Sequence, residues 1–138
     1  MIGFSKSTIA LAFLLLSLSA AAQRIQAGNY ATIGYIKGDG TIQDSHYKTV
    51  GYMKPDGRIQ DDHYVTIGYL KADGRVQDSH YGTVGYVKPD GTIQDSHYSV
   101  IGHVKSDGTV QDSHYKTIGH ASGVKMEWVA VAYFFFAL

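Results

Sequence analysis

Aromatic and β-branched residues alternate with polar residues in short runs that recur along most of the chain. One such run is YKTVGYMK at 47–54, followed by Pro-Asp-Gly and by the shorter run RIQDDH at 58–63. Runs of this length and composition predict β-strands, and an Asp-Gly pair between two of them predicts a hairpin turn. The pattern therefore predicts a chain of β-hairpins.

The pattern repeats every 17 residues, and a tyrosine begins each copy. Five complete copies occupy residues 30–46, 47–63, 64–80, 81–97 and 98–114. Repetition at a fixed period indicates a solenoid, a propeller or a similar array. Because a hairpin of this size is not stable alone in water, the copies must bury their apolar residues against one another. We predict an all-β domain of five hairpin repeats around a central axis.

Proline and glycine refine this prediction. Pro55 and Pro89 directly precede Asp-Gly, and proline suits the second position of a type I turn. We therefore predict type I turns in which the glycine after the aspartate is left-handed and forms a bulge. Another glycine lies inside the first run of every copy, where it predicts a close approach of the backbone to the axis or to a tyrosine ring. These glycines are Gly34, Gly51, Gly68, Gly85, Gly102 and Gly119.

The two ends of the array are complementary. Residues 23–29 correspond to the second half of a copy, and residues 115–120 correspond to the first half. If these half-repeats pair, the array closes into a flower-like or propeller-like ring without exposed sheet edges. An open solenoid would instead need polar caps. We favour the closed ring, and the sequence allows either five petals or six with a composite closing petal.

Two apolar segments flank the repeats. The tail at 124–138 contains MEWVAVAYFFFAL, which is apolar on both faces. This predicts burial, either as a plug along the ring axis or as a strand shared with another chain in a homo-oligomer. At the other end, Lys6, an apolar run at 8–16 and small residues at 20–22 predict a signal peptide over residues 1–22. We expect the repeat domain, residues 23–138, in the periplasm, at the cell surface or secreted.

Charge and cysteine content exclude several classes of site. The sequence has 12 Lys and Arg, 12 Asp and Glu, and no cysteine. Interleaved charges that sum to zero do not predict a nucleic-acid-binding surface. Without cysteine there is no disulfide, thiolate nucleophile or Cys-ligated zinc.

Asp95-Ser96-His97 places an acid, a hydroxyl and an imidazole side by side, and close variants occur in every copy. If this segment ends a strand, Asp95 and His97 point to one face and Ser96 to the other, so the trio is not a local catalytic triad. We expect no enzyme and no cofactor. Two hypotheses remain for the repeated Asp–His pairs. In the first, each carboxylate fixes the tautomer of its histidine; in the second, the imidazoles bind metal. A belt of five histidines around the ring is too wide for a single tetrahedral metal site. The candidate metal ligands are His46, His63, His80, His97 and His114.

A second row of aromatic residues is a candidate binding surface. Repeated tyrosines near Asp-Gly hairpins resemble choline- and glucan-binding cell-wall repeats, although Trp128 lies outside the copies here. Two hypotheses stay open: packing between hairpins, and binding of a glycan or peptide by the ring surface. The candidate binding residues are Tyr35, Tyr52, Tyr69 and Tyr86.

The signal peptide, the five copies of roughly Y-x-T-[IV]-G-[YH]-x-K-x-D-G-x-[IV]-Q-D-[SD]-H and the aromatic tail together resemble the five-fold β-flower proteins. The resemblance covers residues 23–138. It implies hairpin petals around an axis in a small exported bacterial protein, and it brings no catalytic residues. We expect a non-enzymatic structural or binding module. The alternative is a glycan-, peptide- or metal-binding protein that uses the repeated Tyr or Asp-His positions, with a cell-surface glycan or protein as partner.

Overall fold

The computed structural model describes residues 23–136, so the predicted signal peptide lies outside the described residues. The described part of the chain folds into strands of four or five residues followed by one short helical segment. The strands are β1 (Arg24–Ala27), β2 (Thr32–Ile36), β3 (Thr41–Asp44), β4 (Thr49–Met53), β5 (Arg58–Asp61), β6 (Thr66–Leu70), β7 (Arg75–Asp78), β8 (Thr83–Val87), β9 (Thr92–Asp95), β10 (Val100–Val104), β11 (Thr109–Asp112) and β12 (Thr117–His120). The helical segment comprises α2 (Met126–Ala130) and the π-helical turn η1 (Val131–Phe135).

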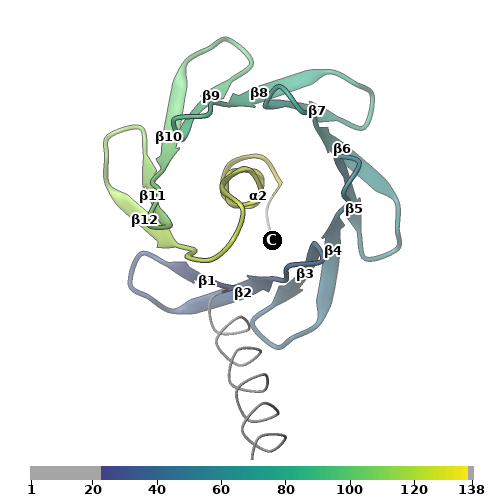
Figure 1. Ribbon diagram of the computed structural model, residues 1–138, viewed down its shortest axis with the longest axis horizontal. Coiled ribbons are helices and arrows are strands. Elements are labelled where there is room, and N and C mark those ends of the chain that lie inside the picture. Colours follow the sequence, from purple (N-terminus) through teal and green to yellow (C-terminus); the bar gives the residue numbers. More distant parts are fainter. Residues whose placement is uncertain (1–22, 137–138) are drawn as a thin grey trace, which may run out of the picture.

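The strands form a closed ring. Each strand pairs antiparallel with the next one along the chain, and β1 pairs with β12. At this seam Gln26 lies opposite His120, and Ala27 lies opposite Gly119. The two half-repeats therefore close the sheet as predicted, and each strand from β1 to β12 is paired on both sides (Figure 1).

The Asp-Gly turns have the predicted conformation. In the turn at residues 37–40, the Gly40 N–H donates to the Lys37 carbonyl oxygen at 2.9 Å. Gly40 has a φ of 91°, whereas Asp39 is not left-handed. Equivalent hydrogen bonds and positive glycine φ angles occur in the four other copies. These are type I turns followed by a glycine bulge, and we call the end of the ring that carries them the base.

The Asp-Ser-His-Tyr segments were expected to end strands, and this prediction is wrong because each strand stops at the aspartate. In the turn at residues 95–98, the Tyr98 N–H donates to the Asp95 carbonyl oxygen at 3.1 Å. Tyr98 has a φ of 66°, so tyrosine takes the left-handed position that glycine occupies in the basal turns. The equivalent residues are Tyr30, Tyr47, Tyr64, Tyr81 and Tyr115.

These tip turns define six petals. The petals are the hairpins β1–β2, β3–β4, β5–β6, β7–β8, β9–β10 and β11–β12, which splay outward around the ring (Figure 1). The five Asp-Gly turns join neighbouring petals, and the β12–β1 pairing stands in for a sixth such turn. The ring therefore has six petals, and we call the end that carries the tip turns the crown.

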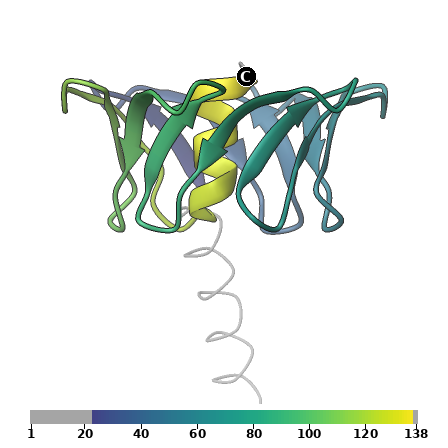
Figure 2. The ribbon, with the colours of Figure 1, turned by 90° about the horizontal axis from the view of Figure 1, so that it is seen from above.

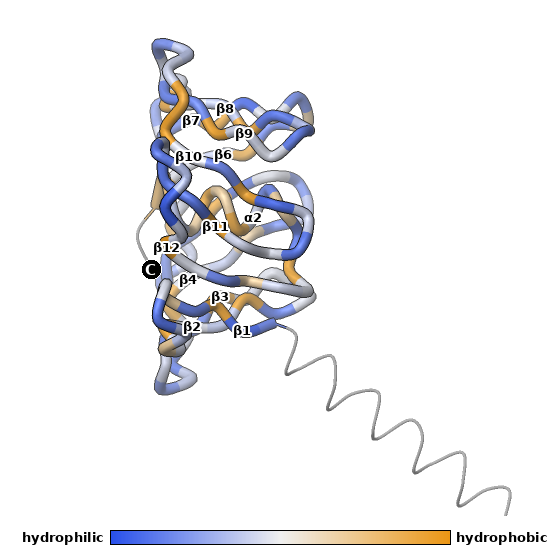
Figure 3. Tube along the Cα trace, turned by 90° about the vertical axis from the view of Figure 1, so that its left-hand side faces the viewer, coloured by the Kyte–Doolittle hydropathy of each residue, from blue (hydrophilic) through white to orange (hydrophobic). Residues whose placement is uncertain are grey.

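The C-terminal segment fills the ring. The helix stands along the axis inside the strands (Figure 2), so the predicted plug is confirmed and the shared strand is not the arrangement observed. Val129, Ala130, Val131 and Ala132 are buried within the core. The strands surround them with inward apolar side chains: Ile25, Ile36, Ile42, Met53, Ile59, Val76, Val87, Ile93, Val104 and Val110. In Figure 3 the hydrophobic residues lie along the strands and the helix, and the turns are mostly hydrophilic.

A row of aromatic residues at the end of the helix packs onto the strand glycines. Phe135 lies over Gly85, Phe134 over Gly102, and Tyr133 over Gly119. Phe136 lies over Gly68, so successive aromatic residues cover the glycines of successive petals. A Cβ atom at any of these glycines would come closer than 3.0 Å to the ring above it. The predicted close approach at the axis is therefore confirmed for these four glycines. At Gly34 and Gly51 the atom nearest to a Cβ is instead the carbonyl oxygen of Gln43 or Gln60.

Gly85→Ala is expected to destabilise the protein. The added methyl group would come closer than 3.0 Å to both the Gln94 carbonyl oxygen and the Phe135 ring. We expect a loss of about 2 kcal/mol in the free energy of unfolding, because this core has no room for the extra volume. Urea unfolding measures the loss as a lower midpoint with an unchanged slope.

Gly82→Ala is the matched control, because other copies carry Lys48, Val65 or Ser99 at the same position. Equal losses for the two variants would contradict the close packing at Gly85.

Candidate functional site

The candidate histidines lie at the exposed tips of the petals and do not converge. Asp95 does not fix the tautomer of His97, so that hypothesis is wrong for the structure observed. Its Oδ1 atom instead accepts the backbone N–H groups of His97 at 2.8 Å and Ser99 at 3.0 Å. The Ser96 hydroxyl lies 3.4 Å from Nδ1 of His97. The aspartate therefore shapes the turn, and it does not orient the imidazole as the acid of a triad would.

The same kind of hydrogen bond lowers the pKa of two tip carboxylates, Asp44 and Asp112. The pKa of Asp112 is lowered mainly by the backbone N–H of Lys116, with a further contribution from the N–H of His114. The pKa of Asp44 is lowered mainly by the N–H of Lys48. Hydrogen bonds to a carboxylate favour its charged form. The backbone N–H groups of the tip turns therefore stabilise the negative charges of Asp44 and Asp112.

One tip brings three metal-binding side chains close together within residues 23–136: Asp61, Asp62 and His63. Nδ1 of His63 lies 3.0 Å from Oδ1 of Asp62. However, Oδ1 of Asp61 already accepts the N–H groups of His63 and Val65. Asp62 and His63 are exposed, and the other copies have serine in place of Asp62. This arrangement is a turn with one extra carboxylate, and it gives the belt of histidines no common metal centre.

The candidate tyrosines pack between petals. The Tyr35 and Tyr47 rings stack with their centroids 4.8 Å apart, and the Tyr35 hydroxyl donates to that of Tyr47 at 3.1 Å. This hydrogen bond is the main reason that the pKa of Tyr35 is raised. Each tip tyrosine thus stacks on a residue of the preceding petal, and Tyr30 on His120 completes the circle across the seam. The other pairs are Tyr52–Tyr64, Tyr69–Tyr81, Tyr86–Tyr98 and His103–Tyr115.

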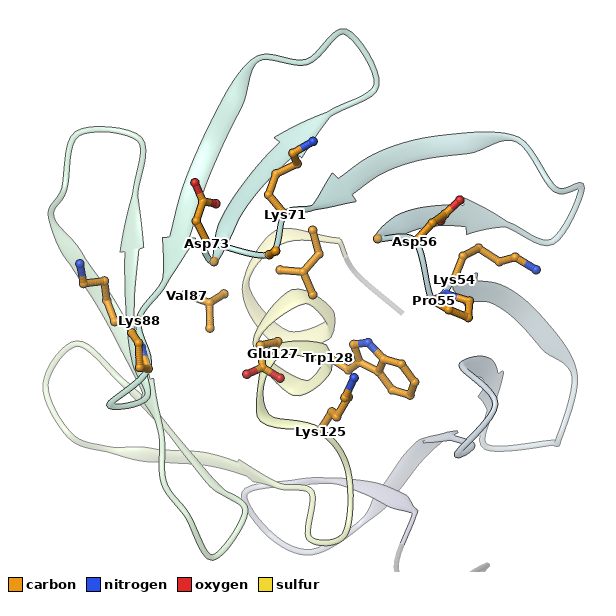
Figure 4. Close-up of a pocket in the computed structure, with 15 residues that line it drawn as sticks. Lys54, Pro55, Asp56, Lys71, Asp73, Val87, Lys88, Lys125, Glu127 and Trp128 are labelled. Carbon is orange, nitrogen blue, oxygen red and sulfur yellow. The ribbon is translucent and has the colours of Figure 1, made fainter.

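A cavity of about 580 Å³ opens at the base, between the start of the helix and three consecutive Asp-Gly turns. Figure 4 shows Trp128 and Glu127 projecting from the helix, with Lys125 beside them. The turns at 54–57 and 71–74 and residues 88–89 form the outer side, and Leu70 and Val87 form the apolar wall. This basal cavity has the size of a small-ligand site.

The basal cavity combines an aromatic ring with several cations. Trp128 is half-buried, and the Lys125 ammonium lies 5.3 Å from its ring centroid. The two turn aspartates of the cavity already have partners: Asp56 binds Arg58 at 2.8 Å, and Asp73 lies 3.9 Å from Arg75. Across residues 23–136, no lysine lies within 4.0 Å of a carboxylate. The cavity lysines are therefore available to a ligand.

The sequence contains two signals for this cavity. Trp128 is the only tryptophan, and a lysine stands two residues before the aspartate of every Asp-Gly turn. Neither signal shows that the residues meet, because this depends on the tail entering the ring from its base. The sequence alone therefore does not predict the basal cavity.

The fold and the cavity define a class of protein: a closed ring of repeated β-hairpins whose lumen is filled by its own C-terminal helix. The family model described as 5-fold beta-flower protein matches residues 22–137, and the chain belongs to this family. No curated protein and no solved structure matches the chain. Within residues 23–136, no helix is both long and apolar enough to cross a membrane.

Acidification is expected to destabilise the ring through the turn aspartates. Asp44 and Asp112 have lowered pKa values in the folded protein. Their contribution is therefore complete above the unfolded pKa of about 3.9 and is lost as the pH falls through the folded pKa. We expect a constant melting temperature from pH 7 to about 5 and a decline below about pH 4.

Asp112→Asn tests this assignment. It should lower the melting temperature at pH 7, and the difference from the unsubstituted protein should shrink toward pH 2 because both then lack the charge. Asp62→Asn is the control, since the Asp62 carboxylate faces the His63 imidazole instead of backbone N–H groups. A pH-independent difference for Asp112→Asn would contradict the assignment.

Proposed function

We propose that the protein is an exported, non-enzymatic binding module that holds a glycan in the basal cavity. The observation that carries this proposal is the cavity itself, which places the Trp128 ring opposite lysines from consecutive turns. Ligand sites are concave, with aromatic surface and a few polar groups that orient the ligand. A sugar ring offers an apolar face to an aromatic side chain and hydroxyl groups to the surrounding polar residues.

The two turn aspartates of the cavity support binding over hydrolysis. A glycoside hydrolase needs a pair of carboxyl groups, one of which has a raised pKa so that it can protonate the leaving group. The pKa of Asp56 is lowered instead, mainly by the backbone N–H of Arg58. Asp73 accepts the N–H of Arg75 at 3.0 Å. Both aspartates serve the turns to which they belong.

Export is proposed on the signal-peptide pattern of residues 1–22. The crown tyrosines are not proposed as the glycan site, because each of them already stacks on a neighbouring petal. The C-terminal segment is not proposed as an oligomer contact, since it packs inside its own ring.

Tryptophan fluorescence tests the proposal directly, because Trp128 is the only tryptophan and lies in the cavity. We expect titration with neutral and acidic oligosaccharides to shift the emission for at least one class, with matching heat in calorimetry. Trp128→Leu should abolish the calorimetric signal. His97→Ala, at a petal tip, should leave it unchanged.

Binding that survives Trp128→Leu but fails in His97→Ala would move the site to the crown. The absence of binding across the whole panel would reject a glycan-binding function.

A further inference from the structure

The two ends of the ring carry opposite charges. The base has nine cationic side chains: Arg24, Lys37, Lys54, Arg58, Lys71, Arg75, Lys88, Lys105 and Lys125. It has six acidic ones: Asp39, Asp56, Asp73, Asp90, Asp107 and Glu127. The crown has six acids, Asp44, Asp61, Asp62, Asp78, Asp95 and Asp112, but only Lys48 and Lys116. With neutral histidines, the formal charge is therefore +3 at the base and −4 at the crown.

The aspartates of the base hydrogen-bond to their own turns. In each Asp-Gly turn an Asp Oδ1 atom accepts the backbone N–H two residues later, as Asp90 does from Thr92 at 2.9 Å. The equivalent hydrogen bonds of the other turns are 2.9 to 3.0 Å long. The lysine at the start of each turn has no such partner within residues 23–136. Cations therefore dominate what a ligand meets at the base.

The repeat presents these cations in a regular series around the ring. Lys54, Lys71 and Lys88 come from three successive turns that line the same cavity. Their side chains extend outward from the rim of the cavity, whereas Lys125 lies beside Trp128 (Figure 4). Glu127 and two turn aspartates are the acids of the cavity. A polymer with one negative group on each sugar would meet one lysine for each petal.

We propose that the ligand of the basal cavity is an anionic glycan, a carboxylated chain of the uronate type. One sugar ring stacks on Trp128, and the carboxylates of neighbouring sugars bind the lysines of consecutive turns. The inference rests on the proposed glycan-binding function and adds the ligand's charge. The negative crown repels the same polymer, so a polyanion binds the ring at one end only.

Two probes that differ only in charge test the inference: tetragalacturonate and its carboxyl-reduced, neutral derivative. Binding to the whole repeat domain is followed by Trp128 fluorescence and by calorimetry. We expect the acidic chain to bind at least about tenfold more tightly at low salt and to lose this advantage at about 1 M salt, where charges are screened within a few ångströms.

Lysine variants locate the binding. Lys71→Ala and Lys88→Ala should each weaken binding of the acidic chain about two- to fivefold, as expected for the loss of a solvent-exposed ion pair. Neither should change binding of the neutral chain. Lys105→Ala is the matched control, because Lys105 has the same place in an Asp-Gly turn but does not line the cavity. Unchanged melting temperatures would show that all three variants fold.

The outcomes separate the two proposals. Equal binding of the acidic and neutral chains would overturn the charge inference and leave the glycan-binding proposal standing. Equal weakening by Lys71→Ala and Lys105→Ala would show diffuse attraction to the rim, and would also overturn the inference. No response to either chain, while another glycan of the wider panel binds, would overturn it as well.

Discussion

The packing of the central helix against the strand glycines is the interaction on which the structure depends. About eight strands close a barrel that its own side chains can fill, whereas much wider barrels enclose a channel. This ring has twelve strands, so its interior needs additional apolar volume. The tail supplies this volume, and the glycines let its aromatic rings approach the strand backbone. Gly119 illustrates the dependence, since the three atoms nearest to a Cβ there all belong to Tyr133.

Repetition and its interruption have different roles. The repeats build six similar petals, join them through stacked aromatic pairs and place the same charges at each end. The tail does not repeat, so residues at the same position of different repeats have different surroundings. Lys71 lines the basal cavity, whereas Lys105 has the same local turn and does not. The basal cavity of this nearly symmetric ring thus lies where the non-repeating helix meets the repeating turns.

The sequence predicts the fold well because period and turn chemistry are local properties. The 17-residue spacing, Pro55 before Asp-Gly and the complementary half-repeats are enough to predict a closed ring of hairpins. The tip turns were misread as strand ends because tyrosine rarely adopts the left-handed conformation that Tyr98 has there. The basal cavity could not be predicted, since Trp128 meets the lysines only through the packing of the tail.

A double-mutant cycle between Gly119 and Tyr133 tests the central claim most directly. Gly119→Ala and Tyr133→Ala should each lower the free energy of unfolding. The loss in the double variant should be smaller than the sum of the two single losses by about 1 kcal/mol or more, because removal of the Tyr133 side chain makes room for the added methyl group. Gly34→Ala provides the comparison, since its Cβ would meet the Gln43 carbonyl oxygen. Combined with Tyr133→Ala, it should be additive within about 0.5 kcal/mol. Additive losses in both cycles, measured by urea unfolding, would contradict the account.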